Sequence, residues 1–315
     1  MCVVKVGTLT IVLVVSFAAV FAQRAKPPPP RHQPLRTHSV NQSDGDLDLV
    51  PADKSAPVAN RVSILLEGEF RVIRSNGIPD HPTGKFPNRG NPNRIEEQHY
   101  EFKIPADPRL ARNVKLLGMR DFGVAVNGIP FNPGAAEWYH GDHRHEWQYE
   151  ALSGAIPLGL DASYAHVQPD GAYHYHGLPM LLLENLGFDP ASHSPLVGWA
   201  GDGFPIYAVY GYTDGKDATA GIRALTPSYR LKTGARPESR GDPAGEYDGT
   251  FVEDYEYVEG LGDLDECNGR STVTPEFPEG TYAYFLTVAW PVVPRCFRGQ
   301  PSREFVRQAP PPPDR

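Results

Sequence analysis

The chain of 315 residues carries a formal net charge of −8, with 38 acidic and 30 basic residues interleaved along it. Because no basic stripe is available to neutralise a phosphate backbone, nucleic acid is not expected as a partner. Proline (33 residues) and glycine (31 residues) are abundant, which favours short strands and turns over long helices.

The first 22 residues have the composition of a secretory signal peptide. One lysine precedes an apolar run from Leu9 to Phe21, and Val20 and Ala22 stand three residues and one residue before the expected cleavage point. The run is too short to span a bilayer comfortably, and no later stretch approaches about 18 consecutive apolar residues. We therefore predict a secreted protein, extracellular or periplasmic, with no membrane span after cleavage.

Residues 23–59 are rich in proline and polar side chains, which predicts a disordered arm. The arm contains the glycosylation sequon at Asn41. A second proline run marks residues 307–315 as a tail. The folded domain is therefore expected over residues 60–306.

Short apolar runs between turn residues predict strands within this domain. The expected elements are paired strands at Val62–Leu66 and Glu69–Ile73, a tight turn at Asn127-Gly128, strands at Tyr173–His176, Phe204–Tyr210, Phe251–Val258 and Thr281–Val288, and a short helix at Met180–Leu186. This pattern predicts an all-β fold, a sandwich or a barrel-like sheet, with few short helices.

An internal repeat divides the domain into two half-units. Leu160-Asp161 is followed by Gly171-Ala-Tyr-His-Tyr175, and Leu264-Asp265 is followed by Gly280-Thr-Tyr-Ala-Tyr284. The second half-unit carries Ala283 and Phe285 where the first carries histidines. Any metal chemistry is therefore expected in the first half-unit alone.

Three histidines of the first half-unit are candidate metal ligands. His174 and His176 lie two residues apart, so both imidazoles leave the same face of a strand, while Tyr173 and Tyr175 point into the core. The intervening Pro169-Asp-Gly171 has the composition of a turn that would bring His166 beside them.

Three neutral imidazoles suit zinc, copper, iron or nickel better than calcium or magnesium, which prefer oxygen ligands. We expect copper or zinc at His166, His174 and His176. The alternative is that these histidines lie on a solvated strand face or only form hydrogen bonds in the core.

Two carboxylates are candidate catalytic residues. Glu137 opens a cluster that runs to Glu146 and includes His140, His143 and His145, and the adjacent Trp138 and Tyr139 could hold it near a pocket. The cluster could complete the coordination of the ion or form a separate site, and its other interpretation is a hydrated loop.

Asp202 lies between glycines just before a predicted strand, where it could orient a histidine, act as a general base, or form a structural turn.

Cys267 and Cys296 remain after removal of Cys2 with the signal peptide. In an oxidising compartment they can form a disulfide, but two buried thiols or one thiolate on a metal are alternatives. The chain has no glycine-rich phosphate loop, no His-Glu-x-x-His helix and no Gly-x-Ser-x-Gly elbow, which gives no support for nucleotide enzymes, common metalloproteases or α/β-hydrolases.

The chain resembles the YHYH-domain family of secreted proteins, named for the tetrapeptide present here as Tyr173-His-Tyr-His176. The motifs that carry the resemblance are Asn127-Gly-Ile-Pro-Phe131, His166 to His176, Gly201-Asp-Gly-Phe-Pro-Ile-Tyr207, Leu264-Asp-Glu-Cys-Asn-Gly269 and Cys296-Phe-Arg-Gly299. The resemblance implies metal binding but no particular reaction. Relatives often carry histidine in the second half-unit, where this chain has Ala283.

Three functions are therefore open. The first is a mononuclear metalloenzyme, an oxidoreductase or hydrolase, whose small molecule or extracellular polymer approaches along an aromatic surface near Trp138, Trp147 and Trp199. The second is a non-catalytic extracellular module with a structural ion. The third is a structural surface or matrix domain whose histidines only form hydrogen bonds.

Overall fold

The structure of the chain is a computed structural model, in which residues 47–142, 144–237 and 241–305 are described. The chain divides into two units, residues 1–33 and 34–315, and every described residue belongs to the second. The predicted signal peptide, the sequon at Asn41, His143 and the tail 307–315 lie outside the described residues. Within those residues, no helix has the length and apolar character needed to cross a membrane.

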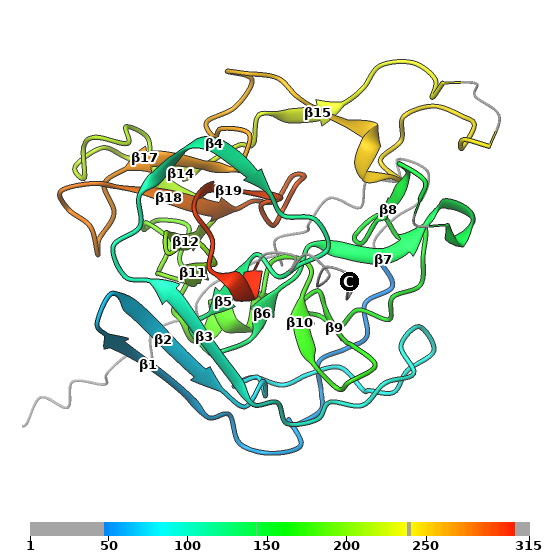
Figure 1. Cartoon of the computed structure of the whole chain (residues 1–315), viewed down its shortest axis with the longest axis horizontal. Helices are drawn as coiled ribbons and strands as arrows, with labels where there is room; N and C mark the ends of the chain where they lie inside the picture. Colours follow the sequence, from blue (N-terminus) through cyan, green and yellow to red (C-terminus); the bar gives the residue numbers. More distant parts are fainter. Residues whose placement is uncertain (1–46, 143, 238–240, 306–315) are drawn as a thin grey trace, which may run out of the picture. The chain divides into compact units, whose positions relative to one another are not determined.

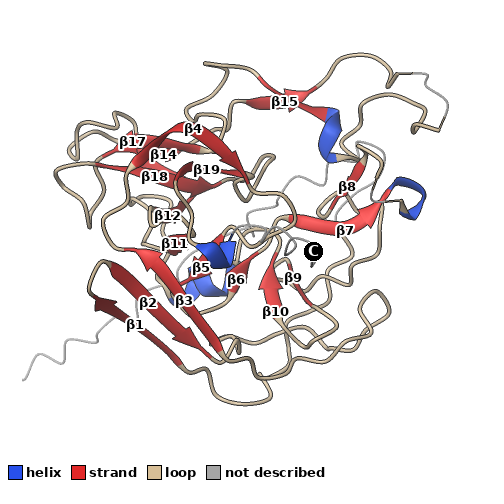
Figure 2. Ribbon diagram, viewed as in Figure 1, coloured by secondary structure: helices blue, strands red, loops and turns tan. Residues whose placement is uncertain are grey.

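Strands make up most of the regular structure, and the helices are short (Figures 1 and 2). The main sheet has eight strands in the order β17-β18-β12-β11-β5-β6-β10-β9. Their bounds are β5 (Gly123–Ala125), β6 (Pro130–Phe131), β9 (Ala165–Val167), β10 (Tyr173–Tyr175), β11 (Gly198–Ala200), β12 (Pro205–Ala208), β17 (Gly269–Thr272) and β18 (Thr281–Leu286). The predicted all-β fold is confirmed, and the main sheet is open, ending in β9 and β17.

Smaller sheets and short helices complete the described fold. One sheet has three strands, β1 (Val62–Glu67), β2 (Phe70–Ser75) and β3 (Tyr100–Pro105). The strand pairs are β4 (Leu110–Leu116) with β19 (Cys296–Gly299), β7 (Gly134–Trp138) with β8 (Gln148–Glu150), β13 (Tyr210–Tyr212) with β14 (Ile222–Ala224), and β15 (Tyr229–Leu231) with β16 (Tyr255–Tyr257). The helices are α1 (Met180–Asn185), η1 (Tyr139–Gly141), η2 (Val252–Asp254) and η3 (Arg303–Phe305).

Most of the expected elements are present. β1 and β2 form the predicted antiparallel pair, and α1 matches the predicted short helix. The Asn127-Gly128 turn joins β5 to β6: Gly128 has a φ of +82°, which glycine adopts without strain, and its N–H donates to the Ala125 carbonyl at 2.8 Å.

The segment predicted as a strand over Phe251–Val258 differs in its first half. Residues Val252–Asp254 form η2, and only Tyr255–Tyr257 form a strand, β16. The fully buried Asp254 carboxylate explains the turn, because it accepts the N–H groups of Gly249 and Phe251 and pairs with Arg236 at 2.7 Å. Local hydrogen bonding to a carboxylate here replaces strand pairing.

The eight-stranded sheet repeats one four-stranded arrangement. The series β9-β10-β6-β5 is mirrored by β17-β18-β12-β11, with β10 parallel to β6 and β18 parallel to β12. The halves meet at the antiparallel pair β5–β11, where Val124 lies opposite Trp199. The two half-units expected from the repeat therefore correspond to the two halves of this sheet.

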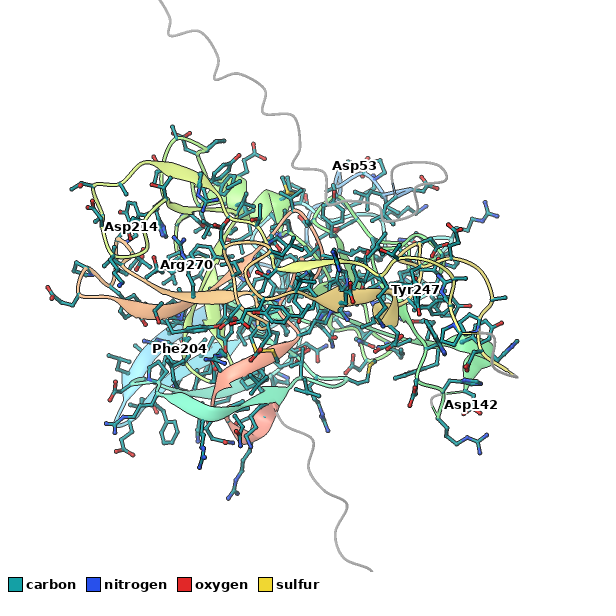
Figure 3. All side chains as sticks on the ribbon, turned by 90° about the horizontal axis from the view of Figure 1, so that it is seen from above. Asp53, Asp142, Phe204, Asp214, Tyr247 and Arg270 are labelled. Carbon is teal, nitrogen blue, oxygen red and sulfur yellow. A yellow bond between two sulfur atoms is a disulfide. The ribbon has the colours of Figure 1, made fainter. Side chains whose placement is uncertain are left out.

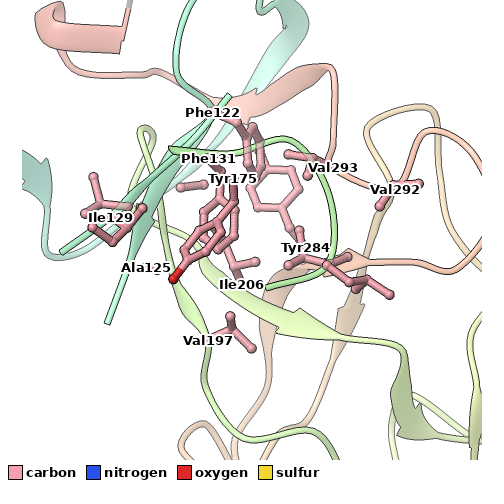
Figure 4. Close-up of a cluster of buried hydrophobic side chains, with 14 of the residues drawn as sticks. Phe122, Ala125, Ile129, Phe131, Tyr175, Val197, Ile206, Tyr284, Val292 and Val293 are labelled. Carbon is pink, nitrogen blue, oxygen red and sulfur yellow. The ribbon is translucent and has the colours of Figure 1, made fainter. Parts of the chain in front are cut away.

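Aromatic rings from both half-units form the core between them (Figure 4). Phe131 packs against Tyr175 at a ring-centroid distance of 5.5 Å, and Phe122 packs edge-on against Tyr284 at 4.9 Å. All four side chains are fully buried, and each contributes roughly 1.5–3 kcal/mol of hydrophobic stabilisation. This packing fixes which face of β10 points inward.

The described end of the predicted arm, residues 47–59, lies against the folded domain. Leu47 and Leu49 pack on the core, and Val50 forms a parallel bridge with Asp161. Burial of these apolar side chains stabilises the segment against the domain. The prediction of a disordered arm was based on proline and polar content and did not take these residues into account.

Cys267 and Cys296 form a disulfide, with their Cα atoms 5.1 Å apart. The bond links the turn before β17 to β19. The two cysteines are therefore neither free buried thiols nor thiolate ligands of a metal.

Candidate metal centre

The β9–β10 hairpin brings the three predicted histidines together. His166 lies directly opposite His174 in the antiparallel register, and His176 follows two residues later on the same side of the chain. The connecting turn is closed by the Gly171 N–H, which donates to the Gln168 carbonyl at 2.9 Å. The convergence expected from the turn composition is therefore present.

The Nε2 atoms of the three rings face one another. His176 Nε2 is 3.0 Å from His174 Nε2 and 3.0 Å from His166 Nε2. All three lie within 4.8 Å of one another, and they are the one group of three or more His, Cys, Asp or Glu side chains in the described residues that could share an ion.

Backbone carbonyls set the orientation of two of the rings. His166 Nδ1 is 3.1 Å from the Leu158 oxygen, and His174 Nδ1 is 3.2 Å from the Ala172 oxygen. Since a carbonyl only accepts, each Nδ1 carries the proton in a neutral ring, and each Nε2 presents a lone pair. At least two of the three Nε2 atoms in the cluster are therefore acceptors.

His176 Nδ1 is buried close to the Asn132 backbone and makes no hydrogen bond of ordinary geometry with a described residue. The third ring is therefore held mainly by packing.

Burial keeps the imidazoles neutral. The exposed fractions of His174 and His176 are 3% and 2%, and His166 is partly exposed. Loss of hydration lowers the pKa of His174 to about 3, lowers that of His176 well below its usual value, and also lowers that of His166. Neutral rings with free Nε2 lone pairs are the form in which histidine binds a metal.

The tyrosines of β10 anchor the strand from its other face. Tyr173 donates to the buried Asp161 carboxylate at 2.7 Å, and burial raises the pKa of Asp161. The Tyr175 hydroxyl lies 2.7 Å from His81 Nε2 and accepts a hydrogen bond from Asn127 at 2.9 Å. No sequence pattern pointed to His81, which is 94 residues from Tyr175.

Replacing Tyr173 with phenylalanine should lower the free energy of unfolding by about 1–3 kcal/mol, because the buried Asp161 carboxylate loses a donor. Denaturant unfolding measures the loss. Tyr210→Phe is a matched control, since its hydroxyl has no hydrogen-bond partner among the described residues. Equal stabilities of the two variants would contradict this role for Tyr173.

The second half-unit holds other residues in the equivalent positions. Arg270 lies opposite Ala283, as His166 lies opposite His174, and Phe285 takes the place of His176. Arg270 donates to the Tyr212 carbonyl at 2.5 Å, and its guanidinium lies 5.8 Å from the Phe285 ring. In the second half-unit, an arginine, an alanine and a phenylalanine therefore occupy the positions that the three histidines occupy in the first.

Asp202 is not brought to the histidines. It lies in the second half-unit, where its carboxylate accepts the Tyr284 hydroxyl at 2.6 Å and the Gly299 N–H at 2.8 Å. Asn127 contacts Tyr175 in the first half-unit, but there the Asn127 amide donates to the tyrosine hydroxyl at 2.9 Å. These contacts give Asp202 a structural part in holding β18 to β19, and burial raises its pKa to about 6.

Glu137 is exposed on β7 and does not join the histidine group. It lines a pocket that also contains Trp138 and Ile156. Its role as a base stays a prediction. The aromatic surface expected near three tryptophans is smaller than predicted, because Trp147 and Trp199 are 7% and 8% exposed and pack in the interior.

Fold and site together define an all-β protein with a buried cluster of three histidines on one hairpin of a duplicated sheet. The family model described as YHYH protein matches residues 101–299, and the chain belongs to this family. The matched range contains both half-units and all five motifs on which the resemblance rests. No curated protein and no solved structure matches the chain.

Proposed function

We propose that this chain is a secreted protein that binds one copper or zinc ion through His166, His174 and His176. The observation that carries the proposal is the meeting of three Nε2 atoms, two pairs of them 3.0 Å apart, with two rings held so that Nε2 is unprotonated. Unprotonated Nε2 atoms directed at one point are a suitable set of ligands for a cation.

The donor set fits these metals. Imidazole nitrogens bind zinc and copper at about 2.0–2.1 Å, so two ligands of one ion lie roughly 3.0–3.4 Å apart. Leu158 and Ala172 supply the backbone carbonyls that commonly orient ligating histidines. The separations and the second hydrogen bonds of the rings therefore both agree with the proposal.

The enzymatic form of the proposal is an oxidoreductase or a hydrolase. Three histidines are the protein ligands of some catalytic zinc sites, where the ion activates a bound water. His166 is the partly exposed member of the set, so a small molecule or a polymer end would approach from its side. His174 and His176 would exclude water from the opposite side by their burial.

The non-catalytic form is a module with a structural ion. The near-complete burial of His174 and His176 favours this form, because structural ions are commonly enclosed in the fold that they stabilise. Secretion, in either form, is supported by the Cys267–Cys296 disulfide, since disulfides persist in oxidising compartments.

Elemental analysis of natively purified protein tests the proposal. We expect about one equivalent of copper or zinc in the wild type, and a loss of at least about tenfold in affinity in His174→Ala and His176→Ala. His99→Ala, an exposed histidine outside the cluster, is the control and should keep the ion. A wild type without metal that also binds neither ion on addition would overturn the proposal.

Spectroscopy of the loaded protein then separates the two forms. An exchangeable water on the ion is expected of an enzyme, and a closed first coordination sphere is expected of a structural site.

A further inference from the structure

A pocket of about 620 Å³ lies beside β7, outside the histidine cluster. It is formed by the end of β7, the η1 turn and one side chain of β8. Its lining residues are Ala136, Glu137, Trp138, Tyr139, His140, Gly141, Tyr149 and Ile156.

Aromatic rings form most of the apolar wall of this pocket. Tyr139 and Tyr149 both pack on the buried Phe251, at ring-centroid distances of 5.7 and 4.7 Å, which fixes their positions. Trp138 is half-buried and completes the wall. The π-faces of tryptophan and tyrosine carry partial negative charge, so they attract cations.

Glu137 gives the pocket a negative charge, and His140, whose ring lies 4.0 Å from that of Tyr139, is the lining residue that could carry a positive one. Glu137 is exposed, and its carboxylate makes no ion pair or hydrogen bond with a described residue. No lysine or arginine lines the pocket. Arg144, a short distance along the chain, is already paired with Asp142 at 2.7 Å, and Asp142 lies at the edge of the molecule in Figure 3.

We propose that this pocket binds an organic cation, an ammonium or guanidinium group, held between the aromatic rings and the Glu137 carboxylate. A cation over Trp138 and the two tyrosines gains cation–π attraction, and Glu137 supplies a charged hydrogen-bond acceptor. The net charge of −8 would favour the approach of such a ligand over that of an anion.

The cation pocket and the metal centre share one chain segment. Ile156 lines the pocket, and Leu158, whose N–H donates to the Ile156 carbonyl at 3.1 Å, holds His166. Binding of the cation does not require the ion, so this inference stands independently of the proposed metal.

Calorimetric titration of the full chain with tetramethylammonium and with L-arginine tests the proposal, with and without chelator. We expect both cations to bind under both conditions, and to bind at least about tenfold more weakly to Glu137→Gln and Trp138→Leu. Glu146→Gln, an exposed acid outside the pocket, is the matched control and should bind as the wild type does.

Sodium acetate and methyl glucoside are the comparison ligands. If either binds as tightly as the cations, if neither cation binds, or if Glu137→Gln binds arginine as the wild type does, the pocket is not a cation site. Because Glu137 is exposed, its substitution tests the proposal even if Trp138→Leu fails to fold.

Discussion

In the presence of chelator, the wild-type chain should lose about 3 kcal/mol of stability relative to His174→Leu when the pH falls from 7 to 4. Burial lowers the pKa of His174 to about 3 in the folded state, whereas an unfolded histidine titrates near 6.5. Between these values the unfolded chain binds more protons than the folded chain. The contribution of His174 is therefore complete above about pH 6.5 and is lost as the pH falls towards 3.

Comparison with the variant removes the contributions of titratable groups that do not interact with His174. Burial raises the pKa of Asp121 and of Asp202 to about 6, and these groups favour the folded state as the pH falls. Both proteins share them, so their contributions cancel in the difference. Denaturant unfolding at several pH values measures the two curves, and parallel curves would contradict a buried, neutral His174.

Removal of the disulfide should have an effect of similar size. The bond closes a loop across 29 residues, and the entropy of the unfolded chain that it removes corresponds to about 3–4 kcal/mol. The variant in which Cys267 and Cys296 are both alanine should therefore unfold at lower denaturant concentration. Reduction of the wild type should lower its stability by a similar amount.

The same variant tests whether metal binding by the three histidines depends on the disulfide. Cys267 lies in the turn before β17, in the second half-unit, whereas His166 and His174 lie on β9 and β10 and His176 directly follows β10. We expect the variant to bind copper or zinc with unchanged stoichiometry at low denaturant concentration. Loss of the ion together with the disulfide would show that the first half-unit depends on the second.

Local patterns were sufficient to predict the hairpin and its histidines. The alternation of Tyr173, His174, Tyr175 and His176 defines the two faces of a strand, and Gly171 supplies the turn conformation that returns the chain. The all-β class followed from the same short-range signals. These features depend on residues close together in the sequence.

Long-range contacts could not be predicted in the same way. Asp202 meets Tyr284 across 82 residues, and its site looks like an ordinary Asp-Gly turn in the sequence. Trp147 and Trp199 are buried by segments that no local pattern identifies. The turn at Phe251 forms around the Asp254 carboxylate, which also binds Arg236 from 18 residues earlier, and no local pattern predicts that partner.

In each half of the duplicated sheet, the residues that hold the hairpin in place lie on one face of the strand, and the residues that differ between the halves lie on the other face. Tyr173 and Tyr282 each donate to an aspartate on one face of their strands, Asp161 or Asp265, whatever stands on the other face. Imidazoles, or an alanine and a phenylalanine, are accommodated there without a change of register. The residues on the second face can therefore change in one half-unit while the tyrosine–aspartate contacts that hold the hairpins stay the same in both.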